Sequence, residues 1–286
     1  MDLSLYCEIE IAKLLRKHKI VLKKSLGQNL LLDLDACKKI ASTVSLEDEV
    51  VIEIGPGVGN LTQAILQNKP KQLVVIEKDS TLKSVLSKLE SKNSTLNVEY
   101  ADAMHASLSL FTSNPVHIFG NLPYNISTQL IFKWIEEISL IKSLTLTLQS
   151  EVADRICSLP GTKNYGKLGI LCQLFFNCSE VIKLKPELFF PVPSVHSTTV
   201  HMIPKVHILD KELIQNIKII TSIAFSQRRK MLRQSLKPAF HSPINACTAA
   251  NIDSTIRAED VTIEQYVHLA KHLRDLESKN SQLKEN

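Results

Sequence analysis

The sequence predicts an α/β protein in which a mostly parallel sheet, covered by helices, is followed by a small all-helical domain. Between residues 49 and 149, short runs rich in β-branched residues alternate with segments of helical periodicity. Such alternation is typical of parallel strands joined by crossover helices. Residues 210–276 contain no convincing strand pattern and are predicted to form consecutive helices. We therefore expect two domains, residues 1–204 and residues 205–286.

The expected elements follow in order along the chain. The strands of the first domain have the length and β-branched content of buried strands, and they cover residues 50–54, 73–77, 97–100, 116–119 and 144–148. Helical periodicity marks residues 60–67, 81–90, 127–138 and 169–176. Two further strands, 180–184 and 197–203, are expected to close the sheet as an antiparallel edge hairpin. The second domain is expected to contain helices 211–225, 227–236 and 262–276, with breaks at Pro238 and Pro243.

Basic residues are concentrated in two stretches of the 286-residue chain, whose formal net charge is +5. Residues 11–24 hold six lysines and arginines and no acid, and residues 226–237 hold five and no acid. The rest of the chain is therefore acidic. Two basic segments on an acidic body indicate a polyanionic partner, with two solvated helix faces as the alternative.

The sequence does not favour a membrane protein or a disulfide or zinc scaffold. No apolar run approaches the roughly 18 residues of a membrane-spanning helix, and Asp2, Glu8 and Glu10 do not fit a signal peptide. The six cysteines form no CxxC pair and no cluster, which favours reduced thiols and no metal site. We expect a soluble cytoplasmic protein, and a monomer because no oligomer signal is present.

A glycine-rich turn follows the first expected strand. Gly55, Gly57 and Gly59 form a GxGxG pattern directly before the first helix, where a backbone without side chains can approach a ligand. The dinucleotide fingerprint requires GxGxxG, and the phosphate-binding P-loop requires a following Lys-Ser/Thr. The turn alone is a weak signal for a cofactor site.

Acidic residues at the strand ends strengthen this signal. Glu77 ends the second strand, at a position where a carboxylate can accept hydrogen bonds from both ribose hydroxyls of a nucleoside ligand. Asp102 follows the third strand and can accept from an exocyclic adenine amine. Together with Glu53 near the end of the first strand, this pattern resembles the Rossmann-like fold of methyltransferases that use S-adenosylmethionine (SAM).

The fourth strand runs into Asn121, Leu122, Pro123 and Tyr124. This NLPY segment is either an ordinary turn or a variant of the Asn/Asp-Pro-Pro-Tyr motif of amino methyltransferases. In the second interpretation the Asn121 side-chain oxygen and a backbone carbonyl of Leu122 or Pro123 accept the protons of an adenine amine, which localises its lone pair. Pro123 stiffens the turn, and Tyr124 offers a ring for stacking of the base.

With these residues in place, the sequence resembles the small-subunit rRNA adenine dimethyltransferases over nearly its whole length. Seven segments occur in the order of that family: KSLGQN at 24–29, EIGPG at 53–57, NLPY at 121–124, QSEVA at 149–153, YGKL at 165–168, AFSQRRK at 224–230 and RAE at 257–259. The departures are Leu30, Ser194 and His196, where the family usually has Phe, Lys and Asp. The last two lie in the loop expected to surround the target base.

The resemblance implies roles for particular residues. It implies a SAM site formed by Gln28, Asn29, Leu31, Gly55, Gly57, Glu77, Asp102 and Asn121. It further implies that Phe189 stacks on the flipped adenine opposite Tyr124, although Phe190 competes for this role and a core aromatic is the alternative. The basic segments are then expected to contact rRNA phosphates, through Lys23, Lys24, Arg228, Arg229, Lys230 and Arg233.

The implied reaction is SAM-dependent N6,N6-dimethylation of two adjacent adenosines in the 3′-terminal hairpin loop of small-subunit rRNA, within an assembling 30S subunit. A methyltransferase of large-subunit rRNA is a related alternative, and the segments at 224–230 and 257–259 favour the small-subunit type. A binding protein on the same fold, acting in ribosome assembly or transcription, is an alternative of another class. The intact set of Glu77, Asp102, Asn121 and Tyr124 indicates an enzyme instead. Nothing in the sequence specifically favours methylation of DNA adenine.

Overall fold

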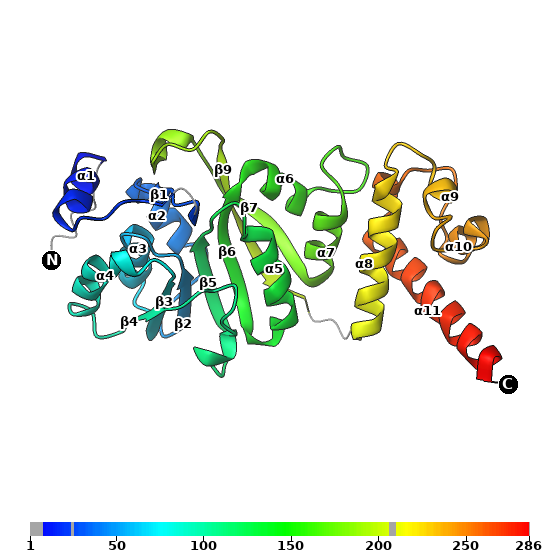
Figure 1. Cartoon of the computed structure of the whole chain (residues 1–286), viewed down its shortest axis with the longest axis horizontal. Helices are drawn as coiled ribbons and strands as arrows, with labels where there is room; N and C mark the ends of the chain where they lie inside the picture. Colours follow the sequence, from blue (N-terminus) through cyan, green and yellow to red (C-terminus); the bar gives the residue numbers. More distant parts are fainter. Residues whose placement is uncertain (1–7, 24–25, 206–209, 286) are drawn as a thin grey trace. The chain divides into compact units, whose positions relative to one another are not determined.

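The computed structural model describes residues 8–23, 26–205 and 210–285, which form two compact units (Figure 1). The first unit contains the chain up to residue 153 together with residues 177–204, and the second contains residues 154–176 and the chain from residue 205 onward. The single boundary predicted near residue 205 differs from this division, because residues 154–176 group with the second unit.

The first unit is built on a seven-stranded sheet with the order β4-β3-β2-β5-β6-β9-β7. Neighbouring strands from β4 to β6 pair in parallel, and β9 pairs with β6 in antiparallel orientation. The strands are β2 Val50–Ile54, β3 Gln72–Glu77, β4 Leu96–Tyr100, β5 Val116–Asn121, β6 Ile141–Gln149, β7 Phe176–Leu184 and β9 Ser197–Pro204. Nearly all residues of β2 and β3 are buried, as expected for strands covered on both faces. The predicted fold class is confirmed.

Helices of the first unit pack on this sheet and on each other. They are α1 Glu8–Lys17, α2 Leu34–Ala41, α3 Asn60–Gln67, α4 Lys83–Glu90 and α5 Ser127–Glu136, with α6 Ser150–Cys157 spanning the division between the units. Side chains of α2 and α3 share one core cluster with Val51, Leu73 and Phe119 of the sheet. Leu15 of α1 packs in a second cluster with Val85 and Leu86 of α4.

A separate two-stranded sheet ties the chain before α2 to the loop before β9. Strand β1, Leu30–Leu31, pairs antiparallel with β8, Phe189–Phe190, so that Leu31 lies opposite Phe189. Neither strand was predicted, because two residues show no periodicity. This pairing holds residues 30–31 in a defined register beside the main sheet.

The second unit is helical. It contains α7 Lys167–Phe175, α8 Lys211–Ser226, α9 Leu232–Ser235, α10 Pro243–Ala249 and α11 Ile263–Glu285. Tyr165 is fully buried in its core beside Phe225, and its hydroxyl donates a hydrogen bond to the Val261 carbonyl at 3.0 Å. These contacts explain why the segment around Tyr165 groups with the second unit. None of the helices among the described residues is long and apolar enough to cross a membrane.

The predicted helix 227–236 is wrong. Helix α8 ends at Ser226, and only the four residues of α9 are helical in the predicted range. The Arg228 side chain donates to the Lys163 carbonyl at 2.5 Å and to the Glu259 carboxylate at 2.5 Å, and Met231 forms a β-bridge with Arg257. These partners are distant in sequence, so they override the local helical pattern.

Candidate active site

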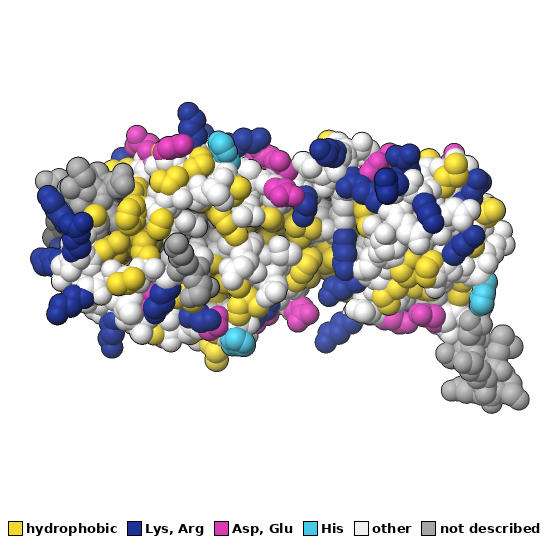
Figure 2. Space-filling view, turned by 45° about the horizontal axis from the view of Figure 1, so that its top comes forward, with side chains coloured by type: hydrophobic (Ala, Val, Ile, Leu, Met, Phe, Trp, Pro, Cys, Tyr) yellow, Lys and Arg dark blue, Asp and Glu magenta, His cyan; other side chains and the backbone are white. Residues whose placement is uncertain are grey.

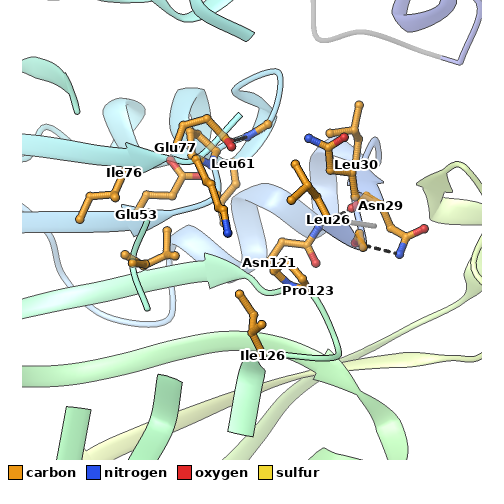
Figure 3. Close-up of a pocket in the computed structure, with 18 of the residues that line it drawn as sticks. Leu26, Asn29, Leu30, Glu53, Leu61, Ile76, Glu77, Asn121, Pro123 and Ile126 are labelled. Carbon is orange, nitrogen blue, oxygen red and sulfur yellow. Dashed lines mark hydrogen bonds between the residues drawn. The ribbon is translucent and has the colours of Figure 1, made fainter. Parts of the chain in front are cut away.

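A cavity opens at the carboxyl edge of the parallel strands (Figure 3). Its wall is formed by residues from five segments, within 26–31, 53–61, 76–78, 101–103 and 121–126. Open α/β sheets bind ligands at this edge because the loops after neighbouring strands converge there. All eight residues of the predicted cofactor site lie on the wall: Gln28, Asn29, Leu31, Gly55, Gly57, Glu77, Asp102 and Asn121.

The glycine turn between β2 and α3 requires glycine for its conformation. Gly55, Gly57 and Gly59 all have positive φ angles, of 67°, 58° and 89°. A Cβ atom on Gly57 would lie 2.6 Å from the Leu30 Cδ2 atom, so a side chain here would also collide with the wall across the turn. At Gly55 and Gly57 the turn therefore presents backbone without a side chain to the cavity.

Glu77 is held in the cavity wall by backbone amides. One carboxylate oxygen accepts from the Gly57 N–H at 3.3 Å, and the other accepts from the Asp79 N–H at 2.8 Å. The residue is buried, and burial raises the pKa of its carboxyl above the ordinary value despite these hydrogen bonds. Each oxygen keeps a further lone pair, so the carboxylate can still accept from two hydroxyl groups of a ligand.

Asp102 lies on the wall just after β4, the strand that pairs with β3, and is a fixed anion. Its carboxylate accepts from the Met104 N–H at 2.9 Å and from the Lys78 ammonium at 2.8 Å, and it contacts the His105 Nδ1 atom at 3.1 Å. Burial raises the pKa of this carboxyl, but the hydrogen bond from Lys78 and the other contacts outweigh that effect and lower it overall. Asp102 is thus a charged acceptor for a donor such as an adenine amine.

The loop after Asp102 is braced by α5. The Lys133 ammonium donates to the Ala103 carbonyl at 2.7 Å and also to the Ala106 carbonyl. Glu137, at the end of the same helix, accepts from the Leu108 N–H at 3.0 Å and from the Ser107 hydroxyl. The helix that begins after the NLPY segment therefore also holds the loop that carries Asp102.

A Lys133→Met variant is expected to bind SAM about tenfold more weakly than the wild type, with little loss of thermal stability. Methionine keeps an unbranched apolar stem but cannot donate to the two loop carbonyls, so the wall beside Asp102 loosens. Isothermal titration calorimetry of SAM binding measures the effect. Lys38→Met is the matched control, because the Lys38 ammonium forms an exposed ion pair with Asp35 and no other contact with the part of the chain that the structure describes. Unchanged affinity in Lys133→Met would show that the brace does not support the site.

Asn121 at the end of β5 is oriented by the N-terminal segment. Its side-chain amide donates to the Asn29 carbonyl at 2.6 Å, which leaves the Oδ1 atom as an acceptor at the cavity. The Pro123 carbonyl accepts from the Ile126 and Ser127 N–H groups, whereas no hydrogen bond from the described residues reaches the Leu122 carbonyl. Of the two carbonyls left open by the sequence, that of Leu122 is therefore the one available to a target amine.

The two aromatic residues predicted to hold the target base have different environments. Tyr124 is half-buried, and its hydroxyl forms a 2.8 Å hydrogen bond with the Ser197 hydroxyl at the start of β9. Phe189 is only 2% exposed and packs in the core cluster with Leu31 and Phe119. The stacking role of Phe189 stays a prediction, and its burial favours the alternative of a core aromatic. Phe190 is half-buried.

Two polar residues of the cavity wall each have an oxygen atom without a hydrogen-bond partner among the described residues. The Asn60 side chain donates to the Leu31 carbonyl at 2.9 Å, while its Oδ1 atom has no hydrogen-bond partner among the described residues. The Oε2 atom of the buried Glu53 is in the same condition, and burial raises the pKa of this carboxyl to about 8. Both oxygen atoms are buried behind the cavity surface. The sequence reasoning missed Asn60, although its place directly after the glycine turn is a usable signal.

The residues predicted to contact rRNA have mixed environments. Lys23 forms an ion pair with Asp79 at 2.8 Å, and Lys24 lies outside the described residues. In the second unit Arg228 is engaged by Glu259, whereas Arg229 and Lys230 are exposed and Arg233 is half-buried. Figure 2 shows many Lys and Arg side chains at the surface of this unit.

The sheet order, the glycine turn and the acid-lined cavity at the carboxyl edge are together those of the Rossmann-like methyltransferases, the class that uses SAM. A family model described as "Ribosomal RNA adenine dimethylase" matches residues 20–275. The chain therefore belongs to the ribosomal RNA adenine dimethylase family, which confirms the resemblance, the enzyme class and the cofactor predicted from the sequence.

Curated relatives and solved structures agree with this assignment. The "Ribosomal RNA small subunit methyltransferase A" of Wolbachia pipientis wMel is 40% identical over 95% of this chain and 94% of its own. The protein of the same name from Pelagibacter ubique is 38% identical over 89% and 97%. A dimethyladenosine transferase from Plasmodium falciparum superposes with a TM-score of 0.73 at 26% identity, over 86% of this chain and 98% of its own. The 23S rRNA methyltransferase ErmE gives a TM-score of 0.66 at 26% identity, over 86% and 99%.

Proposed function

We propose that this protein dimethylates the N6 atoms of two adjacent adenosines in the 3′-terminal hairpin loop of small-subunit rRNA, as a monomeric cytoplasmic enzyme acting on an assembling 30S subunit. The observation that carries the proposal is the orientation of Asn121, whose Nδ2 atom is bound to the Asn29 carbonyl and whose Oδ1 atom remains an acceptor at the cavity. The names of the curated relatives favour the small subunit over the large one.

The cavity fits SAM in the chemistry of its wall. Glu77 would accept from the ribose hydroxyls and Asp102 from the adenine amine, while the glycine turn brings bare backbone close to the ligand. When bound, SAM supplies an electrophilic methyl group on its sulfonium.

The NLPY segment prepares the target amine. The amine of adenine is a poor nucleophile because its lone pair is delocalised into the ring. Acceptance of its two protons by the Asn121 Oδ1 atom and the Leu122 carbonyl favours a pyramidal nitrogen with a localised lone pair. Both acceptors are fixed before the base arrives, so their dipoles need no reorganisation during transfer. The Tyr124 ring, held through Ser197, offers a stacking surface for the base.

Contacts with rRNA phosphates are assigned to the exposed residues Arg229 and Lys230, with Arg233 beside them. Arg228 is instead bound to Glu259 and to the Lys163 carbonyl, so it supports the loop that presents its neighbours. Sequence-independent phosphate contacts of this kind position a folded RNA, whose loop shape then supplies specificity.

Transfer of labelled methyl from SAM to small ribosomal subunits that lack adenine dimethylation, followed by mapping of the modified nucleotides, tests the proposal. Label on two adjacent adenosines of the 3′ hairpin supports it, and fully methylated subunits serve as the control. In a parallel reaction with large-subunit rRNA as the acceptor, label there and none on the small subunits would favour the ErmE-like alternative. No label, with binding of SAM and subunits both demonstrated, would favour a non-catalytic assembly factor.

A further inference from the structure

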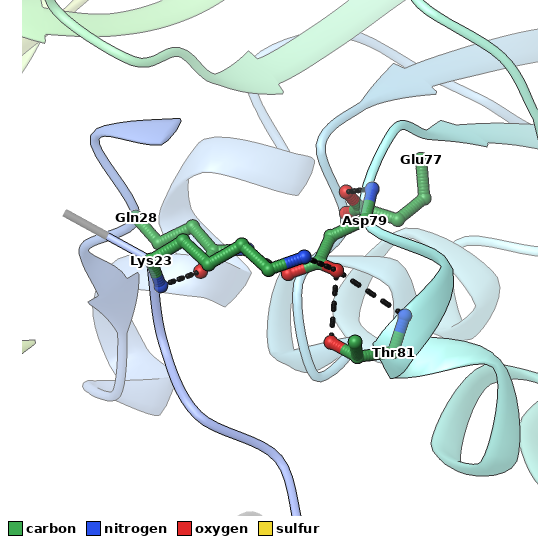
Figure 4. A network of polar contacts seen from close by, with 5 residues as sticks. All are labelled: Lys23, Gln28, Glu77, Asp79 and Thr81. Atoms are coloured by element: carbon green, nitrogen blue, oxygen red, sulfur yellow. Dashed lines mark hydrogen bonds and ion pairs between the residues drawn. The ribbon is translucent and has the colours of Figure 1, made fainter. Parts of the chain in front are cut away.

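Asp79 lies two residues beyond Glu77 and has no predicted contact with the cofactor. It is nevertheless the centre of a network of polar contacts (Figure 4). Its side chain is fully buried, yet it accepts from the Lys23 ammonium at 2.8 Å and from the Gln28 amide at 2.8 Å. It also caps the 3-10 turn Ser80–Leu82 by accepting from the Thr81 N–H at 3.2 Å and the Thr81 hydroxyl at 2.8 Å. These hydrogen bonds outweigh the effect of burial and lower the pKa of Asp79 to about 2.

The same residue is connected to the predicted ribose-binding carboxylate. The Asp79 N–H donates to one oxygen of Glu77 at 2.8 Å, while the side chain of Asp79 reaches the N-terminal segment. Lys23 and Gln28 are also bonded to each other, because the Lys23 N–H donates a hydrogen bond to the Gln28 side-chain oxygen at 2.6 Å. Asp79 therefore joins Glu77 on β3 to Lys23 and Gln28, which come from a part of the chain about 50 residues earlier.

The segment is held at a second point on the far side of Gln28. Residues 26–31 line the cavity, and the Asn29 carbonyl accepts from the Asn121 side chain. The wall made by this segment is thus attached at Asp79 on one side and at Asn121 on the other. Residues 30 and 31 are also held by β8 and by the Asn60 side chain, so loss of either attachment loosens chiefly residues 26–29 of this wall.

We propose that Asp79 is a positioning residue that clasps residues 26–29 against the cofactor cavity through Lys23 and Gln28, and that Lys23 serves this clasp rather than an rRNA phosphate. The inference rests on the cofactor placement proposed above. Lys23 is 45% exposed at its side chain, but its ammonium is bound to a fully buried carboxylate. Withdrawal of Lys23 to a phosphate would leave that buried charge with only neutral donors, which is costly.

The clasp predicts a loss of cofactor affinity without loss of turnover. Lys23→Ala is expected to raise the Kd for SAM about fivefold, and Asp79→Asn about tenfold, with kcat at saturating SAM within about twofold of wild type. Asp79→Asn keeps an acceptor for Thr81 and so retains the cap. The double variant is expected to be little weaker than Asp79→Asn alone, because Asp79→Asn already removes the charge that pairs with Lys23 and the Oδ2 acceptor of the Gln28 amide. Lys23→Arg keeps a positive charge at this position and is expected to bind SAM with nearly wild-type affinity.

Calorimetric titration of the full-length variants with SAM and the salt dependence of their binding to small ribosomal subunits provide the measurements. If Lys23 binds Asp79 and not a phosphate, Lys23→Ala leaves unchanged the slope of the log of the subunit-binding constant against log salt. If Lys23 contacts an rRNA phosphate, the substitution reduces the magnitude of this slope by about one. Lys142→Ala is the matched control for a half-exposed lysine in an ion pair, and Asp210→Ala controls for loss of a helix cap with an ion pair.

Three outcomes would overturn the clasp: unchanged SAM affinity in Lys23→Ala, a reduced salt slope in that variant, or a fall in kcat with SAM affinity retained. Glu77→Ala separates this failure from failure of the cofactor placement. If Glu77→Ala weakens SAM binding and Lys23→Ala does not, only the clasp is wrong. If Glu77→Ala has no effect, the placement itself is wrong.

Discussion

An Asn121→Ala variant is expected to lose methyl transfer by about a thousandfold, while its Kd for SAM rises by no more than about fivefold. The alanine removes the Oδ1 acceptor that localises the lone pair of the target amine. It also removes the hydrogen bond to the Asn29 carbonyl, which accounts for the small loss of affinity. Single-turnover transfer to unmethylated small subunits and calorimetric titration with SAM measure the two effects separately.

Asn121→Asp is the informative companion variant. It keeps an acceptor oxygen near the amine but cannot donate to the Asn29 carbonyl, so the carboxylate is repelled from the position that the amide occupies. We expect transfer between that of wild type and that of Asn121→Ala. Equal losses of transfer and SAM affinity in Asn121→Ala would mean that Asn121 chiefly binds cofactor, and the role given to its oxygen would be wrong.

A Phe189→Ala variant is expected to lose about 3–5 kcal/mol of unfolding free energy, because the ring is almost completely buried among core side chains. Phe190→Ala is expected to lose less, since Phe190 is half-buried. Urea denaturation followed by circular dichroism gives both values. The difference between them tests whether Phe189 belongs to the core.

Phe189→Leu distinguishes packing from base stacking. Leucine preserves much of the buried apolar volume but has no aromatic face, so a core role predicts a small loss of stability and nearly normal kcat. A large fall in kcat at nearly wild-type stability would instead support the stacking role implied by the family resemblance. In that case the ring must leave the core when the base enters.

The sequence predicted the parts of the fold that depend on local patterns. Strand β2 was predicted with its observed bounds because Val50–Ile54 is a short run rich in β-branched residues that ends at the glycine turn. Glu77, Asp102 and Asn121 could be expected to meet because parallel strands bring their carboxyl ends to one edge. Helix α2 was missed although Asp33 caps it by accepting from the Ala36 N–H, a signal that its sequence contains.

The features that could not be predicted depend on pairs of residues far apart in the chain. The partners of Arg228 are Lys163 and Glu259, and these contacts lie where the local pattern predicted a separate helix at residues 227–236. The partner of Lys23 is Asp79, so a residue that looked like an rRNA contact from charge alone is engaged within the protein. Composition describes how much charge a segment has but not what that charge binds.

The pairing of β1 with β8 affects when the cofactor site can form during translation. Leu30 lies opposite Phe190, so about 160 residues separate the two sides of a sheet that borders the cavity wall. During synthesis the glycine turn, Glu77 and Asn121 are all made before β8 exists, and chains fold progressively from the N-terminus. Until β8 is made, residues 30–31 have no strand to pair with, and the loop to be closed is long. We therefore expect a nascent chain to gain its full affinity for the cofactor late in translation, well after its catalytic loop has been synthesised.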